Sequence, residues 1–301
     1  MASEELDWVK RTIAGDRARA GVTTHLYDPA AARASVPETN LPLPSGVMIW
    51  QVIANGVTSY WVETPETKSD RVIVYFHGGG FIAGGFHSHR SLVCWLAQIT
   101  GARILFAEYR LAPEHRFPAA VDDCFNVYRS ALAEDPAEIF VMGDSAGGAL
   151  ATAVAQLCRD KAVRMPDGAI IACGMMNLDE ESSPFLQATQ RTRDGVRLYV
   201  SHLKDLRNPL ASAMEADLQD FPPLLIQTGS DDYCAADCER FARKAEQAGV
   251  DVCFENWPDM VHVWHRFAPK LPESLQALDR IAGWLNETRV ATHQQPALAG
   301  E

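Results

Sequence analysis

The stretch EIFVM-GDSAG, residues 138–147, indicates the fold of this chain. An apolar run typical of a buried strand leads into the pattern G-x-S-x-G, and residues 146–159 then have the composition of a helix. Ser145 is therefore expected on a sharp turn between strand and helix, with its hydroxyl raised to the end of a sheet. Gly143 and Gly147 are needed there because a Cβ at either position would collide with neighbouring backbone.

Strands and helices alternate on both sides of this turn. A hairpin comes first, because residues 48–54 and 57–63 flank Asn55-Gly56, a dipeptide suited to a type I′ turn. Such alternation predicts an α/β fold with a mostly parallel sheet and helices on both faces. The further predicted strands are 71–76, 103–109, 138–142, 168–173, 224–229 and 251–257, and the predicted helices are 90–99, 119–133, 146–159, 236–248 and 272–288.

Two segments depart from this alternation. Residues 1–45 have helical spacing only at their start and are then broken by prolines, and residues 176–220 mix apolar side chains with charges. The second segment is either a surface insertion or, as we favour, part of a helical cap built together with the first. The expected organisation is a cap segment at 1–45, an α/β catalytic domain at 46–175 and 221–290, a second cap segment at 176–220 and a flexible tail at 291–301.

The composition limits the partners and the compartment. A net charge of −12 argues against a nucleic-acid partner, because phosphates would be repelled. The start, MASEELDWVK, is acidic and no apolar run approaches about 18 residues, so we expect neither a signal peptide nor a membrane anchor. Seven dispersed cysteines fit reduced thiols, so the expected location is cytoplasmic.

A glycine run follows the predicted strand 71–76. The sequence His77-Gly78-Gly79-Gly80 leaves backbone N–H groups that can approach an oxyanion closely, and the N–H of Ala146 would be a further donor. A flexible glycine turn is the alternative, but a strand end paired with a downstream serine turn favours the oxyanion hole.

A serine nucleophile also needs a base and an acid later in the chain. Of the histidines after Ser145, we favour His262, because it follows the last strand, while His265 is expected on a helical continuation that points elsewhere. The acid should follow the strand at 224–229, where Asp231 and Asp232 are adjacent candidates that the composition alone does not separate.

Six motifs in this order resemble the bacterial hormone-sensitive-lipase esterases of the α/β-hydrolase fold. The resemblance implies that Asp231 is the acid, that the glycine run supplies the oxyanion donors, that a two-part cap covers the acyl pocket, and that the chain forms a homodimer, as members with GDSAG often do. The matching motifs are His77–Gly80, Tyr109–His115, Phe117–Ala120, Gly143–Gly148, Pro222–Ile226 and Met260–Val263.

The expected function is therefore hydrolysis of short- to medium-chain carboxylic esters, with a small-molecule ester as partner and no metal or organic cofactor. A lactonase or amidase with the same residues is the alternative. A non-catalytic binding protein, like the plant gibberellin receptors that lack the base, is disfavoured by the presence of His262. The apolar residues of the two cap segments predict a closed pocket, which Trp8, Phe185, Leu186 and Tyr199 could line.

Overall fold

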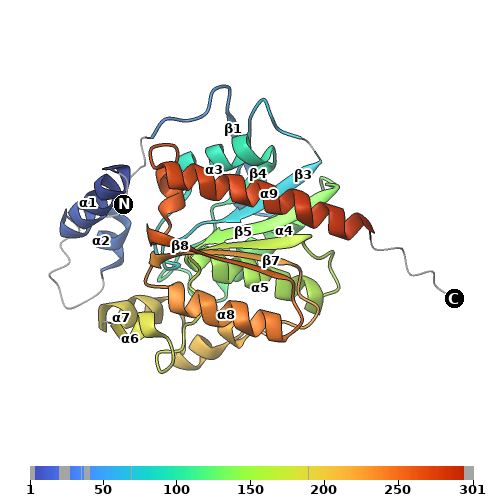
Figure 1. The fold of residues 1–301 in the computed structure, drawn as a ribbon. Coiled ribbons are helices and arrows are strands. Elements are labelled where there is room, and N and C mark those ends of the chain that lie inside the picture. Colours follow the sequence, from blue (N-terminus) through green and yellow to red (C-terminus); the bar gives the residue numbers. More distant parts are fainter. Residues whose placement is uncertain are drawn as a thin grey trace.

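One eight-stranded sheet forms the centre of this computed structural model, which describes residues 4–19, 28–34, 36, 41–68, 70–188 and 190–294 (Figure 1). Its strand order is β1-β2-β4-β3-β5-β6-β7-β8; the contacts β1–β2 and β2–β4 are antiparallel and the others are parallel. The fold is therefore the predicted mostly parallel α/β sheet. The strands are β1 (Met48–Ala54), β2 (Val57–Glu63), β3 (Arg71–Phe76), β4 (Arg103–Ala107), β5 (Glu138–Asp144), β6 (Gly168–Ala172), β7 (Leu224–Asp231) and β8 (Val252–Val261).

Helices cover both faces of the sheet. One apolar core lies between the sheet and α3 (Phe86–Thr100) and α9 (Pro272–Gln294). A larger core lies between the opposite face and the helices α4 (Ala119–Leu132), α5 (Ala146–Asp160) and α8 (Ala235–Gln247). Because successive side chains of a strand point to opposite faces, β3 divides its residues between the two cores. Val72, Val74 and Phe76 belong to the larger core, and Ile73 and Tyr75 belong to the other.

The two segments predicted as a cap lie at the carboxyl ends of the parallel strands (Figure 1). The first segment forms α1 (Glu4–Arg19) and α2 (Pro29–Ala34), and the second forms α6 (Pro184–Ala188) and α7 (Gln190–Tyr199) with two 3₁₀ turns, Leu203–Arg207 and Ala213–Glu215. Arg33 joins α2 to the α/β domain, because its guanidinium donates to the carbonyl oxygens of Ile82 and Ala112 and to both carboxylate oxygens of Glu114.

The predicted elements are present, with different ends. Helix α3 begins at Phe86, four residues before its predicted start, and α9 continues to Gln294, beyond the predicted end near residue 288. The expected flexible tail thus overlaps the end of α9, and its remaining residues, 295–301, lie outside the described part of the chain. None of the described helices is both long and apolar enough to cross a membrane.

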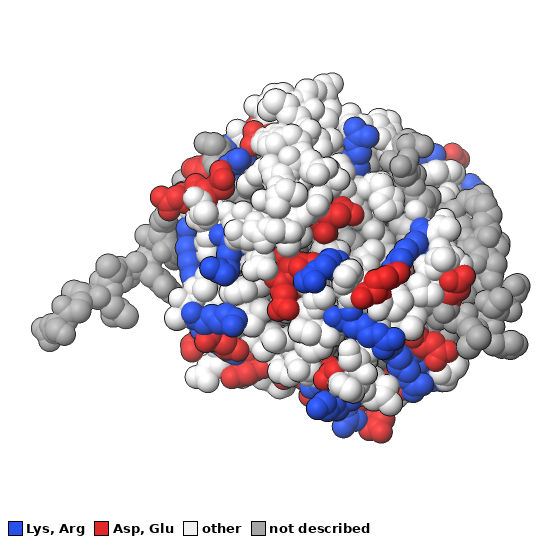
Figure 2. All heavy atoms as spheres, turned by 180° about the vertical axis from the view of Figure 1, so that it is seen from behind, with Lys and Arg blue, Asp and Glu red and all other residues white. Residues whose placement is uncertain are grey.

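Charges of both signs are mixed over the face shown in Figure 2. Lysine and arginine side chains lie next to aspartates and glutamates, and the upper part of this face is mostly uncharged.

Candidate active site

Ser145 occupies the predicted sharp turn between β5 and α5. Its backbone angles are φ 51° and ψ −118°, a conformation that a residue with a Cβ rarely adopts. The two flanking glycines make this turn possible. A Cβ at Gly143 would collide with the carbonyl oxygen of Gly147, and a Cβ at Gly147 would collide with that of Phe76. The turn therefore has the nucleophile-elbow geometry that the sequence predicts.

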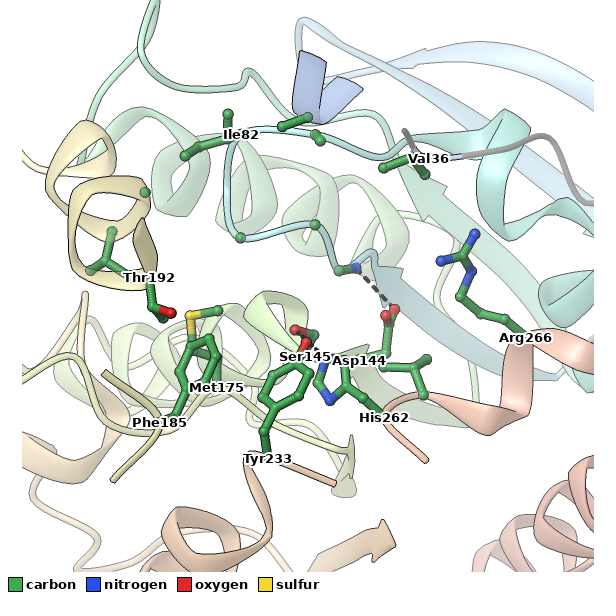
Figure 3. Close-up of a pocket in the computed structure, with 18 of the residues that line it drawn as sticks. Val36, Ile82, Asp144, Ser145, Met175, Phe185, Thr192, Tyr233, His262 and Arg266 are labelled. Atoms are coloured by element: carbon green, nitrogen blue, oxygen red, sulfur yellow. Dashed lines mark hydrogen bonds between the residues drawn. The ribbon is translucent and has the colours of Figure 1, made fainter. Parts of the chain in front are cut away.

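His262 lies within hydrogen-bonding distance of Ser145. Its Nε2 is 2.9 Å from Ser145 Oγ, and its Nδ1 is 2.7 Å from Asp232 Oδ1. With the ring proton on Nδ1, the imidazole donates to the carboxylate and accepts the proton of the serine hydroxyl. The three side chains come from the carboxyl ends of β5, β7 and β8, and they form one continuous hydrogen-bonded chain, of which Figure 3 shows Ser145 and His262.

His265 is buried away from this chain. Its Nε2 is 2.9 Å from Gln227 Oε1, and burial lowers its pKa to about 3, so the ring is neutral. It is therefore a core histidine, in agreement with the preference for His262.

The prediction that Asp231 is the acid is wrong in this geometry. Asp231 points outward with its side chain 46% exposed, and its Oδ2 accepts a hydrogen bond from Lys10 Nζ at 2.7 Å. Asp232 is fully buried and faces His262. Strand β7 has a register irregularity against β8 between Gly229 and Asp231, so the regular alternation of side chains does not continue to these two residues.

The surroundings of Asp232 favour its ionised form. Burial would raise the pKa of this carboxyl group, but the positive potential of His262 and the hydrogen bonds it accepts hold the pKa at about 2. The backbone N–H of Cys234 donates to Oδ1, and the hydroxyl of Thr228 also donates to Oδ2. The carboxylate is thus fixed and charged beside the imidazole, as a group that stabilises an imidazolium must be.

Cys173 joins the acid to the chain segment of the base. Its sulfur accepts the backbone N–H of Val263 at 3.2 Å, and its thiol hydrogen-bonds Asp232. The ligand atoms of Cys173, Asp232 and His262 lie within 4.8 Å of one another, so they are the candidate metal ligands of the described residues. However, burial raises the pKa of this thiol well above its ordinary value, which disfavours the thiolate that a metal needs.

The glycine run after β3 faces Ser145, but one of its predicted donors is already used. The N–H of Gly78 donates to Asp144 Oδ1 at 2.9 Å, so the prediction of Gly78 as an oxyanion donor is wrong in this geometry. Within the described residues, the N–H groups of Gly79 and Gly80 donate to no protein acceptor. Ala146 is the first residue of α5, where an N–H has no acceptor within the helix. These three N–H groups are the candidate oxyanion hole.

Asp144 is a buried group whose role the sequence did not settle. Its carboxylate accepts hydrogen bonds from Tyr75 Oη at 2.7 Å, from the N–H of Gly78 and from His89 Nε2 at 3.2 Å. Burial would raise its pKa, but the charge of His89 and the bonds from His89 and Tyr75 hold the pKa well below its ordinary value. The carboxylate thereby fixes the glycine run against the serine turn.

A cavity of about 380 Å³ opens above Ser145. Both segments predicted as a cap contribute to its wall, which also contains the glycine run and His262 (Figure 3). Of the four predicted lining residues, only Phe185 reaches it. Trp8 packs against Phe267 and Lys270, Leu186 is in the core, and Tyr199 stacks on Phe81. The apolar wall includes Ala32, Val36, Ile82, Met175, Phe185 and Val196.

Comparison with known proteins agrees with this architecture. Residues 73–266 match the alpha/beta hydrolase fold family. An acetyl-hydrolase of Streptomyces hygroscopicus is 36% identical over 94% of this chain and 96% of its own length. An esterase of Acinetobacter venetianus is 33% identical over 72% of this chain and 75% of its own length.

Solved structures give the same result. An esterase from the bacterial hormone-sensitive lipase family superposes with a TM-score of 0.86 at 34% identity, covering 96% of this chain and 99% of that one. A crystal structure of EstE5 soaked with p-nitrophenyl butyrate superposes with a TM-score of 0.87 at 31% identity, covering 95% of this chain and 99% of that one. With its serine turn, its parallel sheet and these relatives, the chain belongs to the bacterial hormone-sensitive lipase family of α/β hydrolases.

Proposed function

We propose that the protein is a carboxylesterase that hydrolyses short- to medium-chain esters through Ser145, His262 and Asp232. The observation that carries the proposal is the hydrogen-bonded chain of these three residues, with distances of 2.9 and 2.7 Å, at the base of the cavity. Two relatives support it, since they are an acetyl-hydrolase and an esterase.

The proposed reaction begins when Ser145 Oγ attacks the ester carbonyl carbon and His262 Nε2 takes the hydroxyl proton. The N–H groups of Gly79, Gly80 and Ala146 stabilise the oxyanion that forms. The alcohol leaves with the proton from His262, and an acyl-enzyme remains. Water, deprotonated by His262, then attacks the acyl carbon, and collapse of the second oxyanion releases the acid and restores Ser145.

Asp232 acts through the imidazole in both half-reactions. It fixes the tautomer with the proton on Nδ1, so that Nε2 faces the serine with its lone pair. Its charge also stabilises the imidazolium that exists between the two proton transfers. Because the carboxylate is buried and its pKa is about 2, it stays ionised over the range in which a histidine base works.

Substitution of the nucleophile tests the proposal. Ser145→Ala removes the attacking oxygen, so turnover of p-nitrophenyl butyrate by purified protein should fall to the background rate. Circular dichroism and thermal unfolding should show that the fold is intact. A folded Ser145→Ala protein with near-wild-type turnover would falsify the assignment.

The size of the cavity determines the proposed chain length. Each methylene that fits among Met175, Phe185 and Val196 adds up to about 0.8 kcal/mol of binding, whereas carbons beyond the wall must displace packed side chains at about 1–3 kcal/mol. We expect kcat/KM to be highest for acyl chains of about four to six carbons and to fall beyond about ten. Rates for esters from acetate to palmitate give the measurement; highest activity on palmitate would contradict a closed pocket.

A further inference from the structure

The outer face of the His262 ring is covered by a stack of aromatic side chains. The Tyr233 ring lies 4.1 Å from the imidazole, centroid to centroid, at an interplanar angle of 32°. On its other side, Tyr233 stacks on Phe185 at 4.7 Å and 19°. Figure 3 shows the three side chains in a row, with Tyr233 between the other two. Two segments that are far apart in the sequence, those of Phe185 and Tyr233, therefore pack against each other beside His262.

The rings of Tyr233 and Phe185 come from segments that are hydrogen-bonded to each other. Tyr233 directly follows Asp232 and precedes α8, and Phe185 is on α6. Ser183, just before α6, donates its hydroxyl to the buried Asp237 of α8 at 2.6 Å. Arg240 of α8 also donates to the carbonyl oxygen of Ser182 at 2.8 Å. Phe185 is therefore held against Tyr233, and it limits the movement of that ring away from His262.

We infer that Tyr233 is a positioning residue that holds the His262 imidazole, by ring stacking, in the orientation that serves both Ser145 and Asp232. The inference rests on the proposed function. The two nitrogens of the imidazole must meet Oγ and Oδ1 at the same time, so a rotation of the ring lengthens both hydrogen bonds. The stack opposes that rotation. Its face also offers negative charge density to the imidazolium that forms during the reaction.

The fold itself gains little from this side chain. Tyr233 is 41% exposed, so it is one of the large apolar side chains that remain at the surface. Its removal should therefore leave the core intact, and the effect on the base can be measured in a folded protein. Because the aromatic ring of Tyr233 makes the stacking contact, Tyr233→Phe should preserve this contact.

The experiment compares Tyr233→Ala and Tyr233→Phe on p-nitrophenyl butyrate. We expect kcat to fall about three- to tenfold in the alanine variant, with KM changed less, and to stay within about twofold of wild type in the phenylalanine variant. The rate at which phenylmethylsulfonyl fluoride inactivates the enzyme should fall in parallel with kcat, because it reports the serine–histidine pair. Trp50→Ala, which removes a similarly exposed aromatic side chain from the edge strand β1 and does not line the cavity, is the matched control and should leave the inactivation rate unchanged.

A double-mutant cycle with Phe185→Leu tests whether Phe185 holds the Tyr233 ring against His262. If Phe185 acts through Tyr233, its substitution should lower kcat in the wild-type background and have little effect in Tyr233→Ala. A change in KM alone, or a failure of phenylalanine to restore kcat, would show that Tyr233 is only a part of the cavity wall. If Tyr233→Ala does not fold, Tyr233→Leu, which keeps the bulk but not the ring, gives the same comparison. An active Ser145→Ala protein would instead defeat the proposed function itself.

Discussion

The buried side chain of Asp144 fixes the segments around the nucleophile relative to each other. It is the second residue of the GDSAG motif, and its carboxylate contacts β3 and the segment that follows it. By accepting from Tyr75 and from the N–H of Gly78, it connects β3 to β5 at the point where both end. The positions of the candidate oxyanion donors and of Ser145 are therefore set relative to each other by one buried carboxylate.

The two adjacent aspartates after β7 should differ sharply in their effect on turnover. Asp232→Asn keeps the shape but favours the wrong imidazole tautomer, so we expect kcat to fall by about 10,000-fold. Asp231→Asn removes only an exposed ion pair with Lys10, of a type worth at most about 1 kcal/mol, and should leave kcat within a few-fold of wild type. Steady-state kinetics of both purified variants provide the comparison, and the opposite ranking would restore Asp231 as the acid.

The sequence predicts most of the candidate site but does not identify which of these two aspartates is the acid. The serine, the base and the glycine run could be located because each follows an apolar run that predicts a strand. The acid could not be located, because the direction of the aspartate side chains depends on a register irregularity between Gly229 and Asp231, which no residue pattern predicts. The same holds for Gly78, whose N–H is occupied by a side chain only because of how the elements meet.

At the scale of elements, the strands and helices of the α/β domain were predictable and the contents of the cap segments were not. Strands β3, β5 and β6 each contain an apolar run and are buried along their whole length, as parallel strands covered on both faces must be. The apolar residues of the two cap segments form no such run, so the sequence does not indicate which of them are buried and which face the cavity. Trp8, Leu186 and Tyr199 pack into the structure behind the cavity, and only Phe185 enters it.

Helix α2 should control the acyl-chain range of the proposed esterase. Ala32 and Val36 line the cavity, and Arg33 between them holds this segment to Ile82, Ala112 and Glu114. Arg33→Ala should loosen that wall and relieve the clash of long acyl chains, so the ratio of kcat/KM for decanoate to that for butyrate should rise about fivefold or more.

The control for Arg33→Ala is Arg243→Ala, which breaks the exposed ion pair with Glu239 on α8. This variant should keep the wild-type ratio. An unchanged ratio in Arg33→Ala would mean that α2 does not limit the cavity.

At the scale of the whole molecule, two buried histidines make stability depend on pH. Burial lowers the pKa of His77 and of His265 to about 3, whereas an unfolded histidine has a pKa near 6.5. Between these values the unfolded chain binds one more proton per histidine than the folded chain does. The free energy of unfolding therefore decreases as pH falls from 6.5 toward 3, by about 1.4 kcal/mol per pH unit for each histidine.

Substitution of one of these histidines should reduce that slope. In His265→Gln the amide can still donate to Gln227, and the free energy of unfolding between pH 6 and 4 should change by about 1.4 kcal/mol per unit less than in wild type. Urea unfolding at a series of pH values gives both slopes. Above pH 8, where both histidines are deprotonated in the folded and the unfolded chain, the proteins should have the same slope. Equal slopes below pH 6 as well would show that His265 protonates without loss of the fold.

The glycines of the serine turn also set how this gene can diverge. A side chain at Gly143 or Gly147 would meet main-chain oxygen atoms, which every amino acid carries, so no second substitution elsewhere can make room for it. The residues of the cavity wall, by contrast, meet other side chains and can change in compensating pairs. We therefore expect descendants of this sequence to acquire new ester preferences rapidly through substitutions in α2, α6 and α7. Gly143 and Gly147, in contrast, should not be replaced by any other residue.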